Sequence, residues 1–204
     1  MADLLEASGL VSATFGIETL NHAAGKAIGK GLQPDKTREL LHWLRDEKWG
    51  ERIVTFSGFI VGLPHETPAT VERWAGEVLD PRFPLHGFRF SPLVINREAK
   101  RFHLSEFERN SETYGYRFTD PADPVHWESD AFTRESAVEM ACDVMLQADR
   151  GGRNRMGGFI PLMFENLGYP WEEVMKMTMG DMNSREALGK RLALVDRYYD
   201  RLMQ

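Results

Sequence analysis

The sequence predicts an α/β protein in which a small parallel sheet is followed by a helical extension. Over residues 11–95, three short runs rich in β-branched and aromatic residues alternate with two amphipathic helical patterns. From residue 133 onward the patterns are helical only. Each connection between the apolar runs is long enough for a right-handed crossover, so we expect neighbouring parallel strands. We place the seam near residue 120, which divides the chain into an α/β part (1–120) and a helical part (121–204).

The first strand and the first long helix are predicted between residues 11 and 50. Residues 11–17 form a short β-branched and aromatic run, and residues 19–31 are polar and punctuated by glycines, as in a loop. Pro34 suits the first turn of a helix, and Gly50 supplies its end. We therefore expect a helix of about four turns between them.

The second strand, second helix and third strand follow in order. Residues 52–62 have few polar interruptions, the pattern of a strand covered on both faces. Thr67 is a suitable N-cap, with Pro68 at the first helical position. Residues 88–95 then predict the third strand. The apolar stripe of the helix has the spacing i, i+3, i+4, i+7, i+8 and consists of Val71, Trp74, Ala75, Val78 and Leu79.

The rest of the chain is predicted to be helical. Residues 105–108 have the spacing of a capping box, and residues 121–124 are typical of a linker. Cys142 lies on an apolar stripe of a long helical pattern, so we expect it in the core. The helical patterns cover residues 133–150, 159–167, 171–179 and 184–203, with a break rich in glycine and arginine at 151–158.

The composition excludes several classes of function. Of the 204 residues 42% are hydrophobic, which is ordinary for a packed globular chain. A net charge of −6 gives no general attraction for nucleic acid, and no apolar run approaches the roughly 18–20 residues of a membrane span. The single cysteine and the spacing of the six histidines predict no metal site in this chain alone. We expect a cytoplasmic protein with no nucleic-acid partner and no membrane span.

Parallel α/β sheets bind ligands at the carboxyl ends of their strands, and the most unusual such end here is residues 58–67. Gly58 and Gly62 flank Ile60 and would let a ligand approach the backbone closely. Glu66 presents a carboxylate beside the start of the next helix. The alternative interpretation is that Glu66 is only a helix-terminal charge and that the glycines only mark a bulge.

Glu18 stands at the end of the first predicted strand. A carboxylate there is well placed to accept hydrogen bonds from the paired hydroxyls of a ribose. A salt bridge of Glu18 with Lys26, Lys30 or Arg52 is the alternative.

Pro92 interrupts the third predicted strand. Because proline cannot donate to a strand ladder, the backbone near Ser91 and Leu93 could offer unpaired polar groups to a flat heterocycle. Alternatively, the proline simply marks an edge or the end of the strand.

Three segments, taken in this order, resemble the second half of a radical S-adenosylmethionine (radical SAM) enzyme. They are Phe-Gly-Ile-Glu-Thr at residues 15–19, Ile-Gly-Lys-Gly at 28–31 and Gly-Phe-Ile-Val-Gly-Leu-Pro-His-Glu-Thr at 58–67. Ser-Pro-Leu at 91–93, Tyr-Gly-Tyr at 114–116 and Trp127 are similar to the branch of that superfamily that often carries an upstream cobalamin-binding domain. The resemblance covers about residues 2–130.

The resemblance implies a fold and a set of binding residues. The three strands would be the fourth, fifth and sixth of a partial β/α barrel, so the α/β part would be half a barrel. By analogy, Glu18 would bind the ribose of S-adenosylmethionine and Glu66 would brace its loop. His65 departs from the family, in which glycine is common at that position. The adenine and methionine moieties would meet Gly58, Ile60 and Gly62 and the backbone of Ser91, Pro92 and Leu93.

The resemblance also implies chemistry that this chain does not carry alone. The family uses a Cys-x-x-x-Cys-x-x-Cys motif to hold a four-iron, four-sulfur cluster, and neither this motif nor a Gly-Gly-Glu segment is present. We expect that Met1 opens within a barrel element and that the cluster comes from a separate N-terminal half. That half, or a homo-oligomer, would cover the hydrophobic strand edge that half a barrel exposes. A complete enzyme could also use cobalamin and would act on a small-molecule substrate by methyl transfer or other radical chemistry.

A second hypothesis belongs to a different class. The chain would then be a degenerate, non-catalytic module whose strand ends bind a partner protein or a nucleotide-like ligand. Neither hypothesis identifies a catalytic residue or a substrate.

Overall fold

A three-stranded parallel sheet forms the centre of the molecule, in the strand order β1-β2-β3. The computed structural model describes residues 1–31, 33–95, 105–118, 126–153 and 170–174. The strands are β1 (Ser12–Glu18), β2 (Val54–Val61) and β3 (Gly87–Pro92). These strands confirm the predicted α/β class with parallel neighbours. A half barrel stays a prediction, because three parallel strands also occur in open sheets.

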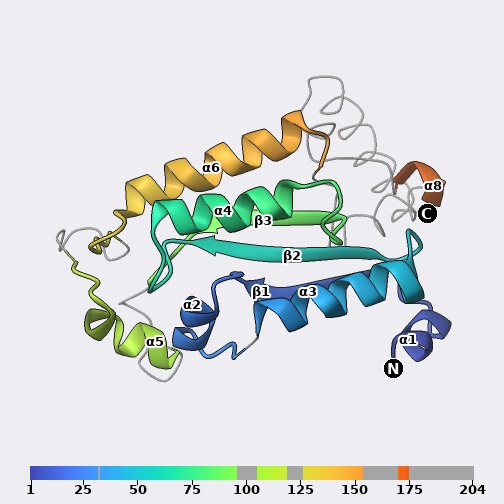
Figure 1. Cartoon of the computed structure of the whole chain (residues 1–204), viewed down its shortest axis with the longest axis horizontal. Coiled ribbons are helices and arrows are strands. Elements are labelled where there is room, and N and C mark those ends of the chain that lie inside the picture. The colour runs from blue at the N-terminus through green and yellow to red at the C-terminus, as the bar shows by residue number, and fades with distance from the viewer. Residues whose placement is uncertain (32, 96–104, 119–125, 154–169, 175–204) are drawn as a thin grey trace, which may run out of the picture.

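The helices α3 (Pro34–Trp43) and α4 (Pro68–Leu79) cover one face of the sheet (Figure 1). The predicted four-turn helix is present, but its second half, Leu44–Trp49, is a π-helix that ends at Gly50. For α4 the sequence prediction is confirmed in detail, since Thr67 and Thr70 form a capping box and Pro68 occupies the first turn.

Side chains alternate across the sheet as the pleat requires. Residues at odd positions of β2, such as Phe59, are buried under the helices, whereas those at even positions from Phe56 onward are only half-buried. We call the second side the open face. Its members are Thr14, Gly16 and Glu18 of β1, Phe56, Gly58 and Ile60 of β2, and Arg89 and Ser91 of β3.

The core on the covered face is aromatic. The rings of Phe59 and Phe90 lie 5.2 Å apart between centroids, and the Trp74 ring lies 5.4 Å from Phe90. These distances are typical of stabilising aromatic pairs. The contacts fasten α4 to both β2 and β3.

Helix α6 (Arg134–Arg150) runs along the outer edge of β3 (Figure 1). Its buried stripe, which includes Ala141 and Val144, belongs to the same hydrophobic core as the sheet. The backbone N–H of Phe90 points at the sulfur of Met145 at 3.3 Å, so this helix takes the place of a fourth strand at that edge. The division of the chain near residue 120 stays a prediction, with α6 as a helix that shares the core of the α/β part.

Short helices complete the described chain: α1 (Ala2–Ala7), α2 (His22–Ala27), α5 (Glu106–Arg109), a 3₁₀ turn (Ser111–Tyr114) and α8 (Trp171–Val174). Two sequence expectations were wrong. The stretch predicted as a loop contains α2, whose N-cap Asn21 accepts hydrogen bonds from Ala23 and Ala24. Cys142 is exposed rather than in the core. The predicted linker at 121–124 and the predicted helices at 159–167 and 184–203 lie outside the described residues.

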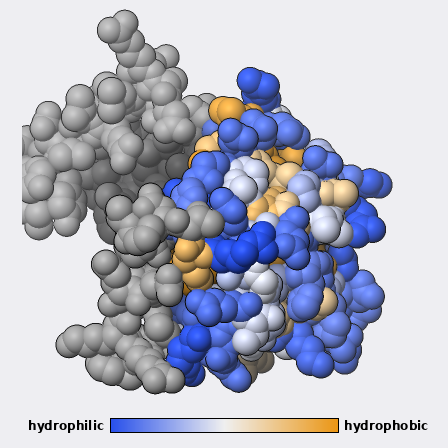
Figure 2. All heavy atoms as spheres, turned by 90° about the vertical axis from the view of Figure 1, so that its left-hand side faces the viewer, coloured by the Kyte–Doolittle hydropathy of each residue, from blue (hydrophilic) through white to orange (hydrophobic). Residues whose placement is uncertain are grey.

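The surface at the carboxyl ends of the strands is mainly hydrophilic, interrupted by small areas of apolar side chains (Figure 2). No helix within the described ranges is long and apolar enough to span a bilayer.

Gly62, just after β2, has a backbone φ of +95° and lies against Trp127, so a Cβ there would approach the indole Cη2 to 2.6 Å. We expect Gly62→Ala to destabilise the fold by about 2–4 kcal/mol, because it adds both backbone strain and a clash. Chemical denaturation would measure this. Gly76→Ala, in open space on α4, is the control and should be neutral or stabilise by up to about 1 kcal/mol. Equal stabilities of the two variants would contradict the packing argument.

Candidate functional site

Glu18 lies at the carboxyl end of β1 in an unusual conformation. Its φ is +66°, and the register of β1 with β2 shifts between Phe15 and Glu18. Such a φ is uncommon for a non-glycine residue and marks a position that its surroundings must hold in place. As a result, the Glu18 side chain lies back over the open face.

The Glu18 carboxylate sits over two glycines. A Cβ at Gly16 would lie 3.3 Å from Glu18 Oε1, and a Cβ at Gly58 would lie 4.0 Å from Oε2. Lys30 forms a salt bridge with Oε1 at 3.3 Å, so the alternative interpretation of Glu18 as an ion-pair partner is correct for this oxygen. Within the described residues, Oε2 has no hydrogen-bond partner. One oxygen is therefore anchored and the other remains available to a ligand.

Three of the other predicted site residues share the open face with Glu18. Gly58 and Ile60 lie on successive pleats of β2, and Ile60 is in register with Ser91 on β3. Glu18 itself is in register with Phe59 of the covered face, because the register shifts before it. Its carboxylate nevertheless reaches the open face, where a Cβ at Gly58 would lie 4.0 Å from Oε2, at the same end of the sheet as Ile60 and Ser91.

Gly62 does not belong to this strip. Its vacant Cβ position faces Trp127, and its carbonyl oxygen accepts a hydrogen bond of 2.6 Å from the hydroxyl of Tyr116. Burial, together with the charge of Glu66, raises the pKa of Tyr116, so this phenol stays protonated and donates. In this structure the close approach that Gly62 permits is that of an aromatic side chain rather than of a ligand.

The expectation of free backbone groups at Leu93 is wrong. Its N–H donates to the carbonyl of Val61 at 2.8 Å, and its carbonyl accepts from the indole N–H of Trp127 at 2.9 Å. Pro92 is the last residue of β3, which confirms the alternative interpretation that it marks the end of a strand. The structure leaves Ser91 as the residue of this segment on the open face.

Glu66 is buried, with 3% of its surface exposed, and connects two strand ends. Its Oε1 accepts a hydrogen bond of 2.6 Å from the hydroxyl of Thr19, which in turn accepts from the backbone N–H of Asn21 at 2.9 Å. The side-chain amide of Asn21 also donates to the backbone carbonyl of His65 at 3.2 Å. We call this set of contacts the clasp, because it ties the segment after β1 to the loop after β2. Glu66 is therefore more than a charge at a helix terminus.

Burial raises the pKa of Glu66 to about 7, against opposing contributions from the Thr19 hydroxyl, the Leu63 backbone and the Trp74 indole. The indole N–H acts without forming a regular hydrogen bond, since neither Trp74 Nε1 nor Glu66 Oε2 has a partner at hydrogen-bonding geometry. A half-satisfied buried carboxylate of this kind is expected to be neutral over much of the acidic range.

His65 adds strain to the same loop. It has a φ of +63°, the region that favours glycine. The imidazole lies edge-on to Tyr114, with 6.2 Å between ring centroids. A cavity of about 240 Å³ opens here between the loop after β2 and residues 114–116. His65 is exposed beside this cavity. The loop thus adopts a positive φ at this position although the residue is not glycine.

The donor set for an iron-sulfur cluster is not provided by this chain. It has one cysteine, and Cys142 is exposed on α6. Among the residues that the structure describes, no three His, Cys, Asp or Glu side chains gather as metal ligands. A cluster therefore does not fit the residues present, and its supply by another chain stays a prediction.

Sequence reasoning missed Thr19 as a partner of Glu66 and Trp127 as the residue that fills Gly62. Both residues lie in segments that carry the resemblance, but the resemblance assigned no role to either of them. Comparisons of the chain with models of protein families, with curated proteins and with solved structures found no match.

The raised pKa of Glu66 predicts that stability falls as pH rises from about 4.5 to 7. In this window the folded chain holds a proton that the unfolded chain releases, so each step upward in pH favours unfolding. The total loss is on the order of 3 kcal/mol. Urea unfolding from pH 4.5 to 7.5 should show this slope in the wild type and lose it in Glu66→Gln. Exposed Glu72 offers the control, and Glu72→Gln should keep the slope.

Proposed function

We propose that this chain is the S-adenosylmethionine-binding, C-terminal part of a radical SAM enzyme, and that Glu18 binds the ribose hydroxyls of that ligand. The observation that carries the proposal is the Glu18 carboxylate held over Gly16 and Gly58 at the carboxyl ends of parallel strands. A carboxylate in this position can accept hydrogen bonds from a vicinal diol. Lys30 holds one oxygen, which leaves Oε2 for the ligand.

The open face supports the rest of the ligand. Gly58 has no Cβ, so its backbone can be approached closely, and Ile60 offers an apolar surface beside it. Ser91 adds a hydroxyl on the neighbouring strand. An apolar strip bordered by a few polar groups is the usual character of a nucleoside site. Adenosine is the moiety that such a strip would recognise.

The chemistry of the complete enzyme would come from a second chain. When bound, the iron-sulfur cluster of the family supplies the electron for cleavage of S-adenosylmethionine, and this chain lacks the cysteines that hold it. The proposed role of the chain is therefore to bind and orient the adenosyl group. Methyl transfer or another radical reaction, with or without cobalamin, would follow in the assembled enzyme.

The alternative function is a non-catalytic module that binds a nucleotide-like ligand by the same residues. The observation that favours it is the isolated state of Cys142, which gives the chain no redox group of its own. The two functions differ in what a second chain adds. A split enzyme gains tight binding and reductive cleavage from a cysteine-bearing N-terminal half, whereas a module binds equally well without one.

Glu18→Ala should weaken the binding of adenosine by about 10–100-fold, because it removes charge-assisted hydrogen bonds to the ribose. Ligand-observed NMR titration with adenosine and with 2′,3′-dideoxyadenosine measures this, and the dideoxy ligand, which lacks both ribose hydroxyls of the diol, should bind wild type and variant alike. Glu139→Ala, which removes an exposed carboxylate from α6, serves as the control. Equal adenosine affinities of the two alanine variants would refute the assignment of Glu18.

Gly58→Val tests the space over the sheet. A Cβ at this position meets only Glu18 Oε2, at 4.0 Å, so the fold should tolerate the change. The added methyl groups would occupy the place of the ligand and should abolish adenosine binding while the thermal unfolding midpoint stays within a few degrees. Retention of adenosine affinity in a folded Gly58→Val protein would place the ligand elsewhere.

A further inference from the structure

Within the described part of the chain, the outer edge of β1 has no partner strand, since β1 pairs only with β2. The Val11 carbonyl accepts from the N–H of Val54 at 2.9 Å, and the Phe15 carbonyl accepts from the Ser57 hydroxyl at 2.9 Å. The odd-numbered residues of this segment therefore direct their backbone N–H and C=O groups toward β2. Because backbone groups alternate along a strand, Ser12 and Thr14 direct their N–H and C=O groups outward. Water can satisfy these groups one by one, and an added extended strand can satisfy the whole alternating row at once.

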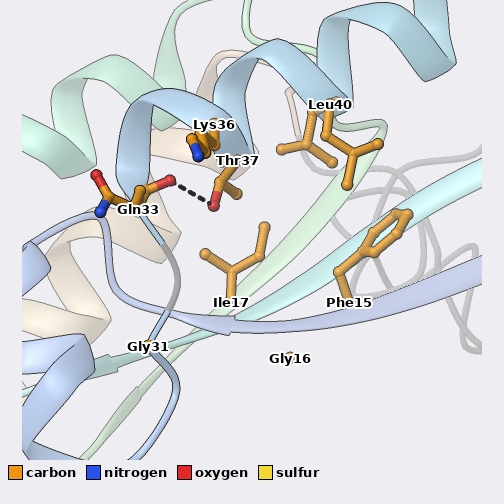
Figure 3. A pocket seen from close by; sticks show the side chains of 9 residues that line it. Phe15, Gly16, Ile17, Gly31, Gln33, Lys36, Thr37 and Leu40 are labelled. Carbon is orange, nitrogen blue, oxygen red and sulfur yellow. Dashed lines mark hydrogen bonds between the residues drawn. The ribbon is translucent and has the colours of Figure 1, made fainter.

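An apolar pocket lies beside this edge, between β1 and α3 (Figure 3). It has a volume of about 560 Å³. Phe15 and Ile17 point into it from the strand, and Leu40 points into it from the helix. Leu40 is 49% exposed, although it is a large hydrophobic residue. The edge therefore combines unsatisfied backbone with apolar surface, as a site for strand addition does.

We propose that a second copy of this chain docks on this edge, with the two β1 strands antiparallel about a two-fold axis at Thr14. The residues that face the axis are self-complementary under this operation. Thr14 lies opposite its own copy and exchanges both backbone hydrogen bonds with it. Phe15 of one copy lies beside Ala13 of the other, so that a bulky side chain meets a small one twice.

The charges at the edge permit this pairing. Residues 12–17 carry no charge and contain no proline, so β1 lacks the usual devices that prevent edge-to-edge association. The charges at its end, Glu18 and Lys30, neutralise each other at 3.3 Å. The residues that would pair across the axis therefore bring no charged side chain to it, and Lys36 is the charged residue that lines the adjoining pocket.

This inference does not depend on adenosine binding, since it uses the edge of the sheet and not the open face. It does bear on the proposed split enzyme. A cysteine-bearing N-terminal half would have to pair with the same edge, so the homodimer and the assembled enzyme would exclude each other.

Sedimentation velocity of the full chain from about 1 to 200 μM tests the proposal. We expect a concentration-dependent monomer–dimer equilibrium. Thr14→Pro removes the outward N–H without touching the ladder to β2 and should weaken dimerisation by at least about tenfold. Thr14→Val, which keeps the N–H, should dimerise like the wild type. A wild-type chain that stays monomeric throughout, or a Thr14→Pro protein that dimerises normally, would overturn the proposal.

Two further variants keep the test decisive if Thr14→Pro fails to fold. Leu40→Glu places a charge at the exposed lip of the pocket and should also weaken the dimer by about tenfold. In a Cys142→Ser background, Thr14→Cys should form an intermolecular disulfide on mild oxidation, since antiparallel partners lie within disulfide range. Glu72→Cys, exposed on α4, should not cross-link. Cross-linking of Glu72→Cys but not of Thr14→Cys would show that another surface associates.

Discussion

A buried carboxylate joins the two loops on which the candidate site depends. Glu66 accepts the Thr19 hydroxyl across 47 positions of sequence, and Thr19 directly follows Glu18. Glu18, with its positive φ, stands between Ile17 and Thr19, whose backbone N–H donates to the Ile17 carbonyl at 2.8 Å, and Thr19 is tied in turn to Glu66. Burial of Glu66 costs desolvation energy, which the raised pKa expresses. The buried carboxylate therefore lies next to the turn that orients the Glu18 side chain.

Aromatic residues behind the rim also hold the segments that follow the strands, in this case by packing and hydrogen bonding. Trp127 fills the space over Gly62 and donates to Leu93, while Tyr116 donates to the Gly62 carbonyl. These contacts use up polar backbone groups that could otherwise have met a ligand. As a consequence, the Gly62 carbonyl and both backbone groups of Leu93 already have partners in the described structure, whereas Gly58 on the open face keeps space above its backbone. The candidate site therefore contains fewer of the predicted residues than the sequence motifs alone suggest.

On the proposed function, the chain would supply an adenosyl-binding surface and another chain the redox centre that the resemblance implies. Glu18 lies over two glycines, and one exposed cysteine cannot hold an iron-sulfur cluster. Among the described residues, the edge of β1 has no pairing strand, and it lies apart from the open face. The two proposals, adenosyl binding and association, therefore concern different surfaces.

Local sequence determined the elements, and tertiary structure determined the site. Thr67, Ser105 and Thr133 cap helices through residues three positions away, so their signals could be read directly from the sequence. The short helix α2 was missed because Gly25 within it and Gly29 and Gly31 after it are typical of a loop. Cys142 was misplaced because two neighbouring positions on a helix can lie on either side of the boundary of its buried stripe.

The sequence by itself determined that three parallel strands end at one rim with Glu18, Gly58 and Ser91 among their last residues. It could not decide which of those residues stay free. That choice depends on Thr19 meeting Glu66, Trp127 meeting Gly62 and Lys30 meeting Glu18. Such contacts join residues far apart in the chain or across a turn, and their geometry is fixed only when the whole core packs.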